Sequence, residues 1–586
     1  MSSTVVDREK PIERLKQRVL RHLIEIYPTA SSELAEKLIG LMNHQAPVQA
    51  PIAQQNHWSE EDVIVITYAN TIKVDGEVPL RSLLDFLDRR FSEVVNTVHI
   101  LPFFPYTSDD GFAVLNYRRV NETFGGWDDI QHIAAKYNLM SDLVINHCSA
   151  HSEWFEQFKK NLSPGKDYFV TADPSADLSD VVRPRTNDLL KAVQTPNGTR
   201  HVWCTFSHDQ VDLNFANPDL LAEMIAIVAF YLSQGVKIFR LDAIAFIWKE
   251  QGTSCLNLKQ AHEIVRLLRT LIESKDPTAL IITETNIPNR ENLAYFGNSN
   301  EAHIIYNFAL PPLLLHAIAT GNNFYLNNWL MSMPPAADGT TYLNFIASHD
   351  GIGLRPIEGI LSDDEVQQLL DIMQSFGGRI SWRNYGAEKT RAYEINISLF
   401  DALQGTLDGP DDYPIQRFIC VHAIMAALEG IPAFYIHSLL ATPNDSTKAD
   451  ALGNNRAINR HVWDANELDG LIKDPESDTA RVLCGLKEML KIRKGQPAFH
   501  PNATQYTLHL GSGLFAFWRQ SRQRHQSIFC IYNITNQIKN FSLTDLNLIE
   551  TQQWKDLLSN TVYLDFDETV LLQPYQCMWL TNFWPK

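Results

Sequence analysis

Eight short apolar runs, rich in β-branched residues, alternate with longer segments of helical character along most of the chain. Runs that are apolar throughout are typical of strands buried on both faces, and such strands form parallel sheets. The eight runs begin at Val63, Thr97, Leu139, Val236, Ala279, His303, Tyr342 and Ile431. Eight parallel strands, most of them separated by helices, predict a (β/α)8 TIM barrel in the α/β class.

Several of these runs end in polar or charged residues. The run from Val236 contains Arg240 and Asp242, which point to the same face of a strand because they lie two residues apart. A charged pair in a buried strand is either a structural ion pair or part of a cleft. Other runs end on His147, Glu284 and the pair His349-Asp350. Because the C-terminal ends of barrel strands meet at one rim, where barrel enzymes have their active sites, this clustering favours a cleft.

The 586 residues are too many for one hydrophobic core, so two or more domains are expected. Amphipathic helices precede the barrel, loop-rich stretches interrupt it after its third and seventh strands, and short alternating runs follow it. We predict an N-terminal helical extension (1–60), a barrel (61–147 and 213–496), an inserted subdomain (148–212), an irregular insertion (351–412) and a small antiparallel β-domain (497–586).

Composition restricts the partners. A net charge of −18 argues against a nucleic acid or an anionic membrane, both of which attract basic surfaces. The seven cysteines are scattered, odd in number and without a C-x-x-C pair, which is typical of free thiols in a reducing cytoplasm. No secretion signal opens the sequence, and no run of 18 apolar residues occurs. We therefore expect a cytoplasmic protein with small-molecule partners and leave its oligomeric state open.

Three carboxylates, Asp242, Glu284 and Asp350, lie at the ends of predicted strands. Cleavage of a glycosidic bond uses two carboxyl groups, one as nucleophile or base and one as acid. A third carboxylate can hold the sugar hydroxyls. We expect Arg240 to keep Asp242 ionised, and the apolar surroundings of Glu284 to raise its pKa toward that of an acid catalyst.

A metal site is the obvious alternative, because His and Asp cluster at the same strand ends. The spacing contains no H-x-x-x-H or similar ligand motif, however. Neither a G-x-S-x-G nucleophile motif nor a G-x-G-x-x-G after a strand is present. We therefore expect no metal and no cofactor.

Four segments, Asp142-Leu-Val-Ile-Asn-His147, Arg240-Leu-Asp242, Glu284 after Ile-Thr, and Ser348-His-Asp350, resemble in this order the four sequence regions of the α-amylase superfamily (glycoside hydrolase family 13). The resemblance implies that Asp242 is the nucleophile, Glu284 the general acid/base and Asp350 the transition-state stabiliser. It also implies that the sugar is bound by His147, Arg240 and His349.

Finer features resemble the sucrose-phosphorylase branch of that superfamily. They are Asp109-Asp-Gly-Phe112, Arg183-Pro-Arg185, Phe206, Gln210-Val-Asp212, His349-Asp-Gly-Ile-Gly353 and Arg456-Ala-Ile-Asn-Arg-His461. This resemblance implies that Asp109 and Arg456 close the glucose pocket, and that Arg185 binds phosphate with help from Tyr393. Phe206 and Gln210 are further predicted substrate-binding residues.

The sequence departs from sucrose phosphorylases at Glu394, where they have glutamine, at Phe246, where they have tyrosine, and in its N-terminal helices. With these helices, Lys249–Cys255 and Tyr393-Glu-Ile-Asn396 are more similar to the glucosylglycerate phosphorylases. Glu394 is therefore also predicted to bind substrate.

The expected activity is that of a retaining phosphorylase. It converts 2-O-α-glucosylglycerate and phosphate to α-glucose 1-phosphate through a covalent glucosyl-aspartate. Alternatives are a phosphorylase of sucrose or sucrose 6-phosphate, an α-glucosidase or transglucosidase, and an inactive barrel, which the presence of all three carboxylates disfavours.

Overall fold

The computed structural model describes residues 6–42, 54–385, 389–546, 548, 553–565 and 569–582. Its centre is a closed barrel of eight parallel strands. In chain order these are β1 (Ile64–Thr67), β3 (Thr97–Ile100), β4 (Asn138–Val144), β9 (Val236–Asp242), β10 (Leu280–Thr283), β11 (Ile304–Tyr306), β12 (Thr341–Asn344) and β18 (Ile431–Tyr435). Each strand lies within or overlaps one of the eight apolar runs, so the prediction of a (β/α)8 barrel is confirmed.

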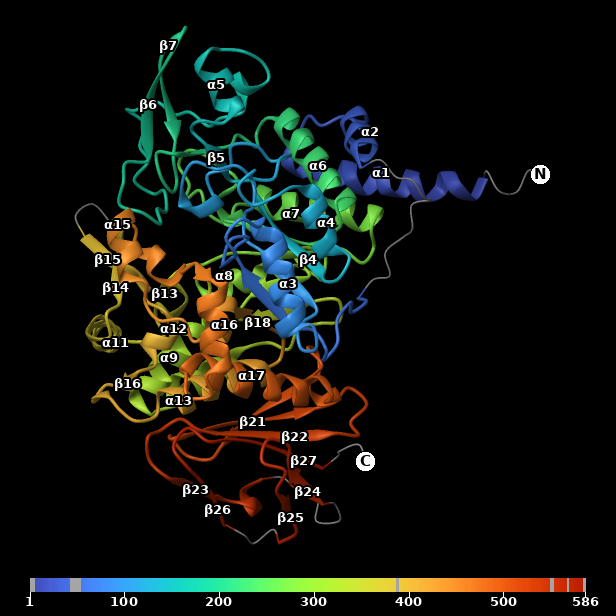
Figure 1. Ribbon diagram of the computed structural model, residues 1–586. Helices are drawn as coiled ribbons and strands as arrows, with labels where there is room; N and C mark the ends of the chain where they lie inside the picture. Colours follow the sequence, from blue (N-terminus) through green and yellow to red (C-terminus); the bar gives the residue numbers. More distant parts are fainter. Residues whose placement is uncertain are drawn as a thin grey trace.

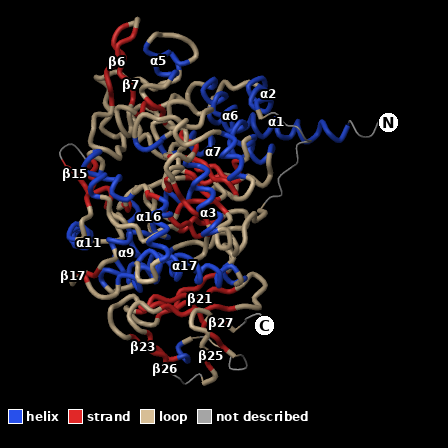
Figure 2. Tube along the Cα trace, viewed as in Figure 1, coloured by secondary structure: helices blue, strands red, loops and turns tan. Residues whose placement is uncertain are grey.

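A helix follows each barrel strand, and the helices surround the strands (Figure 2). The helix after β10 is short, whereas the other seven cover the barrel more fully. The eight helices are α3 (Pro79–Phe91), α4 (Trp127–Ala134), α6 (Pro218–Ser233), α7 (Lys259–Lys275), α8 (Asn289–Leu293), α9 (Leu310–Thr320), α13 (Pro414–Ala427) and α17 (Asp478–Lys494). The barrel closes where β1 pairs with β18, with Ile64 opposite Ala433.

Two helices, α1 (Val6–Ile26) and α2 (Ser32–Leu41), precede the barrel. Helix α1 packs against α7 through the buried residues Val19 and Leu23, and His22 Nδ1 lies 3.0 Å from Glu263 Oε2. The described part of the N-terminal extension is therefore helical and attached to the side of the barrel (Figure 1). Residues 1–5 and 43–53 of the predicted extension lie outside the described residues.

The insertion after β4 contains β5 (His147–Ser149), α5 (Glu153–Lys159), the hairpin β6 (Leu190–Thr195) and β7 (Gly198–Trp203), and β8 (Gln210–Asp212). Strands β5 and β8 pair antiparallel, with His147 opposite Asp212. This pairing joins the two ends of the insertion at the barrel rim. The hairpin lies at the end of the molecule opposite the C-terminal sheet (Figure 1).

The segment 351–412 is regular, so its prediction as irregular is wrong. It contains β13 (Ile352–Gly353), helix α11 (Asp363–Ser375) and the hairpin of β14 (Arg379–Tyr385) with β15 (Lys389–Asn396). The three strands form one antiparallel sheet in the order β13-β15-β14. The hairpin escapes a search for apolar runs because β14 carries Arg379 and Arg383 and leaves Trp382 47% exposed. It matters for the site because β15 carries Tyr393 and Glu394.

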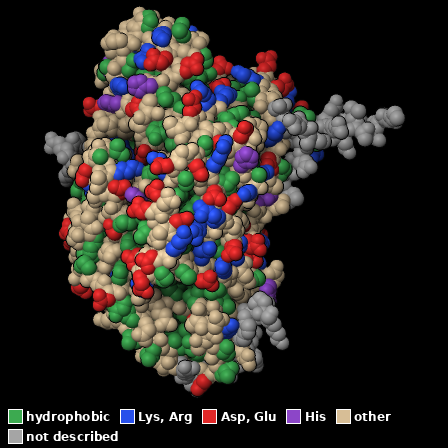
Figure 3. All heavy atoms as spheres, in the orientation of Figure 1, with side chains coloured by type: hydrophobic (Ala, Val, Ile, Leu, Met, Phe, Trp, Pro, Cys, Tyr) green, Lys and Arg blue, Asp and Glu red, His purple; other side chains and the backbone are tan. Residues whose placement is uncertain are grey.

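The C-terminal region forms a six-stranded antiparallel sheet with its own apolar core. Its strands are β20 (Thr504–His509), β21 (Leu514–Gln520), β22 (Ser527–Asn533), β24 (Trp554–Asp556), β25 (Val562–Tyr563) and β27 (Cys577–Thr581), beside the pair β23 (Lys539–Ser542) and β26 (Thr569–Leu572). No helix among the described residues is long and apolar enough to cross a bilayer. Figure 3 shows acidic and basic side chains intermixed over one face of the molecule.

Candidate active site

All predicted site residues except Arg240 line one cavity at the C-terminal ends of the barrel strands. Arg240 does not line the cavity, but it is hydrogen-bonded to Asp242, which does. Those that line it are Asp109, His147, Arg185, Phe206, Gln210, Asp242, Glu284, His349, Asp350, Tyr393, Glu394 and Arg456. The structure thus brings together residues from the barrel, the insertion and the hairpin β14–β15.

Asp242 is the last residue of β9, and its Oδ1 accepts a hydrogen bond of 2.8 Å from Arg240 Nη1. The same nitrogen also donates to Asp142, which in turn lies 2.7 Å from His99 Nε2. Asp142, His99 and Arg240 are all buried. No role was predicted for Asp142 or His99, although a carboxylate inside the apolar run of β4 needs a partner. Together they hold the Arg240 guanidinium beneath Asp242.

Glu284 follows β10, and its Oε2 accepts a hydrogen bond of 2.9 Å from the Ala243 amide, directly after Asp242. Ala243 has a φ of 50°, a left-handed conformation that non-glycine residues rarely adopt. The turn after β9 therefore holds Glu284 beside Asp242.

Burial raises the pKa of both the Asp242 and the Glu284 carboxyl. The nearby Glu284 carboxylate adds to the rise for Asp242, and Asp350 adds to the rise for Glu284. Arg240 donates to Asp242, whereas no described cationic side chain lies within 4.0 Å of the Glu284 carboxyl. Because Arg240 is hydrogen-bonded to Asp242 and not to Glu284, Asp242 is the better placed of the two to carry the negative charge and Glu284 to carry a proton.

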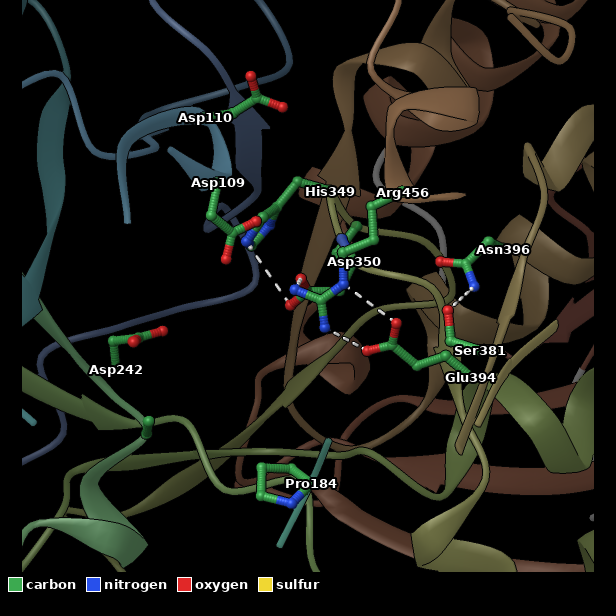
Figure 4. A network of polar contacts seen from close by, with 12 residues as sticks. Asp109, Asp110, Pro184, Asp242, His349, Asp350, Ser381, Glu394, Asn396 and Arg456 are labelled. Atoms are coloured by element: carbon green, nitrogen blue, oxygen red, sulfur yellow. Dashed lines mark hydrogen bonds and ion pairs between the residues drawn. The ribbon is translucent and has the colours of Figure 1, made fainter. Parts of the chain in front are cut away.

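Asp350 lies beside two arginines and His349. Its Oδ1 is 2.6 Å from Arg456 Nη1, and its Oδ2 is 3.6 Å from His349 Nε2 (Figure 4). The same Oδ1 is 3.8 Å from Arg460 Nη2. Although burial alone would raise it, the pKa of Asp350 is held well below its usual range by Arg456 and the other nearby positive charges. Asp350 is therefore an ionised carboxylate.

The two cavity histidines are uncharged. Burial lowers the pKa of His147 to about 4 and that of His349 well below its ordinary value. His147 Nε2 lies 3.2 Å from Gln210 Nε2, and the His349 ring stacks on Phe112 with centroids 5.0 Å apart. Both can exchange hydrogen bonds with hydroxyl groups without adding a charge to the site.

Both carboxylate oxygens of Glu394 are bound to Arg456. Arg456 Nε donates to Glu394 Oε2 over 3.1 Å, and Arg456 Nη2 donates to Glu394 Oε1 (Figure 4). Gly353 pairs with Glu394 across the β13–β15 ladder and so fixes its place at the cavity. The structure thus places Glu394 in the cavity wall, with its charge compensated by Arg456.

Arg460 joins two loops of the rim and is buried. Its Nε donates to the His349 carbonyl over 2.8 Å, and its Nη1 donates to Asp110 Oδ2 over 2.7 Å. Arg460 belongs to one of the motifs that resemble the sucrose-phosphorylase branch, but no role was predicted for it. The feature of the sequence that could have indicated a role for Arg460 is that it is a second arginine four residues after Arg456.

Arg185 is half-buried and reaches the cavity from the insertion. Its guanidinium lies 5.7 Å from the ring centroid of Phe206 and 5.3 Å from that of Tyr393. Its one hydrogen bond to a described residue is from Nη1 to the Pro184 carbonyl over 3.1 Å. The remaining guanidinium donors can therefore bind an anion in the cavity.

The chain is similar to known proteins over nearly its whole length. Residues 91–350 match the model of the α-amylase catalytic domain. The glucosylglycerate phosphorylase of Allomeiothermus silvanus is 40% identical over 97% of this chain and 99% of its own length. The chain belongs to the α-amylase family. Within this family, the sucrose phosphorylase of Bifidobacterium adolescentis is 28% identical over 78% of the chain and 90% of its own.

Among solved structures of the α-amylase family, the sucrose 6F-phosphate phosphorylase of Thermoanaerobacter thermosaccharolyticum has a TM-score of 0.70 to this chain. It is 23% identical and covers 81% of this chain and 94% of its own. This likeness extends the agreement in fold beyond the barrel. At that identity it carries no information on substrate.

Proposed function

We propose that the chain is a retaining phosphorylase that transfers glucose from 2-O-α-glucosylglycerate to phosphate. The observation that carries the proposal is the placement of Asp242, to which Arg240 donates, beside Glu284 in a cavity that Arg185 also lines. The glucosylglycerate phosphorylase that matches nearly the whole chain supports this choice of donor over sucrose.

In the first step the Asp242 carboxylate attacks the anomeric carbon, and the bond from that carbon to the glycerate oxygen breaks. Glu284 gives its proton to the departing oxygen. Asp350 and Asp109 bind sugar hydroxyls as charged acceptors, and His147, Gln210 and His349 bind them as neutral groups. The products are glycerate and a glucosyl ester of Asp242.

In the second step a phosphate oxygen attacks the anomeric carbon, and the bond to Asp242 breaks. Glu284, now ionised, takes the proton of the attacking phosphate hydroxyl. Two inversions at the same carbon give α-glucose 1-phosphate with retained configuration. Formation of α-glucose 1-phosphate from glucosylglycerate, with no product in the absence of phosphate except slow glucose release, tests the proposal. Sucrose and sucrose 6-phosphate are the comparison donors, and preference for either would contradict it.

We expect kcat/KM for the donor to fall as pH rises through the raised pKa of Glu284, because the first step needs its protonated form. An unperturbed glutamic acid loses its proton at about pH 4.3, so the alkaline limb should lie above that value. A pH–rate profile at saturating phosphate measures the limb, and Glu284→Gln should remove it. A limb that persists unchanged in this variant would assign it to another group.

Arg185→Ala should raise the KM for phosphate roughly 10- to 100-fold, as expected for the loss of charge-assisted hydrogen bonds. The ratio of hydrolysis to phosphorolysis should rise with it, because water then competes better for the glucosyl ester. Arg185→Lys should restore only part of the affinity, since an ammonium lacks the planar pair of donors. Initial rates over a phosphate series measure both effects.

Arg200→Ala is the matched control for Arg185, because Arg200 lies in the same insertion but does not line the cavity. Its guanidinium donates a hydrogen bond of 2.8 Å to Thr171 Oγ1. Its kinetics should equal those of the unmodified enzyme. Unchanged dependence on phosphate in Arg185→Ala would show that Arg185 is only a loop residue.

The proposed chemistry uses carboxyl groups and phosphate alone, so we propose that the reaction needs no metal or cofactor. We also propose a cytoplasmic location. All seven cysteines are free thiols, which supports a reducing compartment.

A further inference from the structure

Arg355 is a buried arginine without a partner close to the cavity. It begins the short helix η5 (Arg355–Ile357) after β13, and 7% of its surface is exposed. Its side chain forms no hydrogen bond or ion pair within 4.0 Å with any residue the structure describes, and its Nε is both buried and unbonded. A buried guanidinium without a counter-charge strongly destabilises a fold, so it calls for an anion that binds there.

The surroundings of Arg355 place it beside the wall of the active site. The amide of Leu354, the preceding residue, donates to the Tyr393 carbonyl over 3.0 Å, and the Tyr393 side chain lines the cavity. Burial raises the pKa of Tyr393, and both Arg185 and Arg355 oppose that rise. Tyr393 is therefore near two guanidinium groups, that of Arg185, which lines the cavity, and that of Arg355, which does not.

Two carboxylates near Arg355, those of Glu358 and Glu291, favour its charged form, but neither lies within 4.0 Å of its guanidinium. Arg383, another cation close enough to affect its pKa, is 2.6 Å from Glu358 Oε1, so that carboxylate is already paired. Glu291 accepts a hydrogen bond from Asn257 Nδ2 over 2.5 Å and lies more than 4.0 Å from Arg355. No described carboxylate is therefore paired directly with Arg355.

We propose that Arg355 recognises the carboxylate of the acceptor, together with the Tyr393 hydroxyl, and so selects small 2-hydroxy acids over neutral alcohols. This inference rests on the proposed function. In a 2-hydroxy acid the carboxylate oxygens are separated from the attacking hydroxyl oxygen by one bond more than the free oxygens of phosphate are separated from its attacking oxygen. Arg185 lines the cavity and suits the phosphate, whereas Arg355 does not line it, follows the residue that bonds the Tyr393 backbone, and suits the more distant carboxylate.

The test uses the reverse reaction, in which the enzyme transfers glucose from α-glucose 1-phosphate to either D-glycerate or glycerol. Arg355→Met keeps the length of the side chain and removes its charge. We expect kcat/KM for glycerate to fall roughly 10- to 100-fold, while transfer to glycerol and arsenolysis of α-glucose 1-phosphate stay unchanged. Arg355→Lys should recover part of the glycerate activity.

Thermal unfolding separates recognition from a structural role. Without ligand, Arg355→Met should melt at the same temperature as the unmodified enzyme or higher, because it removes an unpaired buried charge. Glycerate should raise the melting temperature of the unmodified enzyme and not that of the variant. Arg379→Met is the control, since Arg379 lies in the adjacent hairpin and donates to the exposed Asp450 over 2.7 Å.

An equal loss of glycerate, glycerol and arsenate activity together with a lower melting temperature would overturn the inference, and so would an unchanged preference for glycerate. If the unmodified enzyme forms α-glucose 1-phosphate from sucrose but does not use glycerate, the proposed function fails instead.

Discussion

Asp242→Asn should lower turnover of glucosylglycerate by about 10⁴-fold or more, the order seen when the nucleophile of a catalytic unit is removed. The amide cannot form the glucosyl ester, yet it has nearly the volume of the carboxyl group. Arg240 keeps Asp142 as a partner in the variant, so no buried charge is left alone. Steady-state rates and a melting curve measure the two consequences, which are lost activity and a retained fold.

The control for Asp242 is Asp219→Asn, because Asp219 is an exposed carboxylate that pairs with Lys37 over 2.8 Å on the surface. It should be fully active. A sharper test is Asp242→Gly with α-glucosyl fluoride and azide, where the small anion fills the vacated space and attacks from the same side. The product should be β-glucosyl azide, and near-normal phosphorolysis by either Asp242 variant would refute the assignment.

Glu284→Gln should lower turnover of glucosylglycerate roughly 10²- to 10⁴-fold, the range typical of general acid–base catalysis. The loss should depend on the leaving group. Glycerate leaves as an alkoxide unless it is protonated, whereas fluoride departs without an acid, so α-glucosyl fluoride should still form the glucosyl ester. Because the second step then lacks its base, the ester should accumulate, and intact-protein mass spectrometry should show one added glucosyl residue.

Asn286 provides a nearby comparison for Glu284, since it lines the same cavity from the same strand end. Asn286→Ala removes a polar group without removing a proton donor, so its effect should be equal for glucosylglycerate and the fluoride. An equal loss for both donors in Glu284→Gln would mean that Glu284 binds sugar and does not act as the acid.

The barrel could be predicted because each of its strands is buried on both faces and so appears as a continuous apolar run. The hairpin β14–β15 could not, because charged and polar residues interrupt its apolar ones, as Arg379 and the exposed Trp382 beside Arg383 illustrate in β14. Burial pattern, and not strand formation itself, decided which elements could be recognised in the sequence.

The site was predictable as a set of residues but not as a set of pairs. Strand ends in a closed barrel converge, so Asp242, Glu284 and Asp350 could be placed on one rim from the apolar runs that precede them. The partners Arg460 and Asp110 lie 350 positions apart on loops whose course no local pattern encodes. For the same reason, no sequence pattern indicated that Arg456 binds both oxygens of Glu394.

The closing of the barrel between β1 and β18 has a consequence for synthesis of the chain. Until the residues around Ala433 have emerged, β1 and β12 each present an unpaired edge, the kind of surface through which strands of separate chains associate. Arg456 and Arg460 emerge later still. A growing polypeptide therefore carries nearly all of its sugar-binding groups before it can shape them into a pocket.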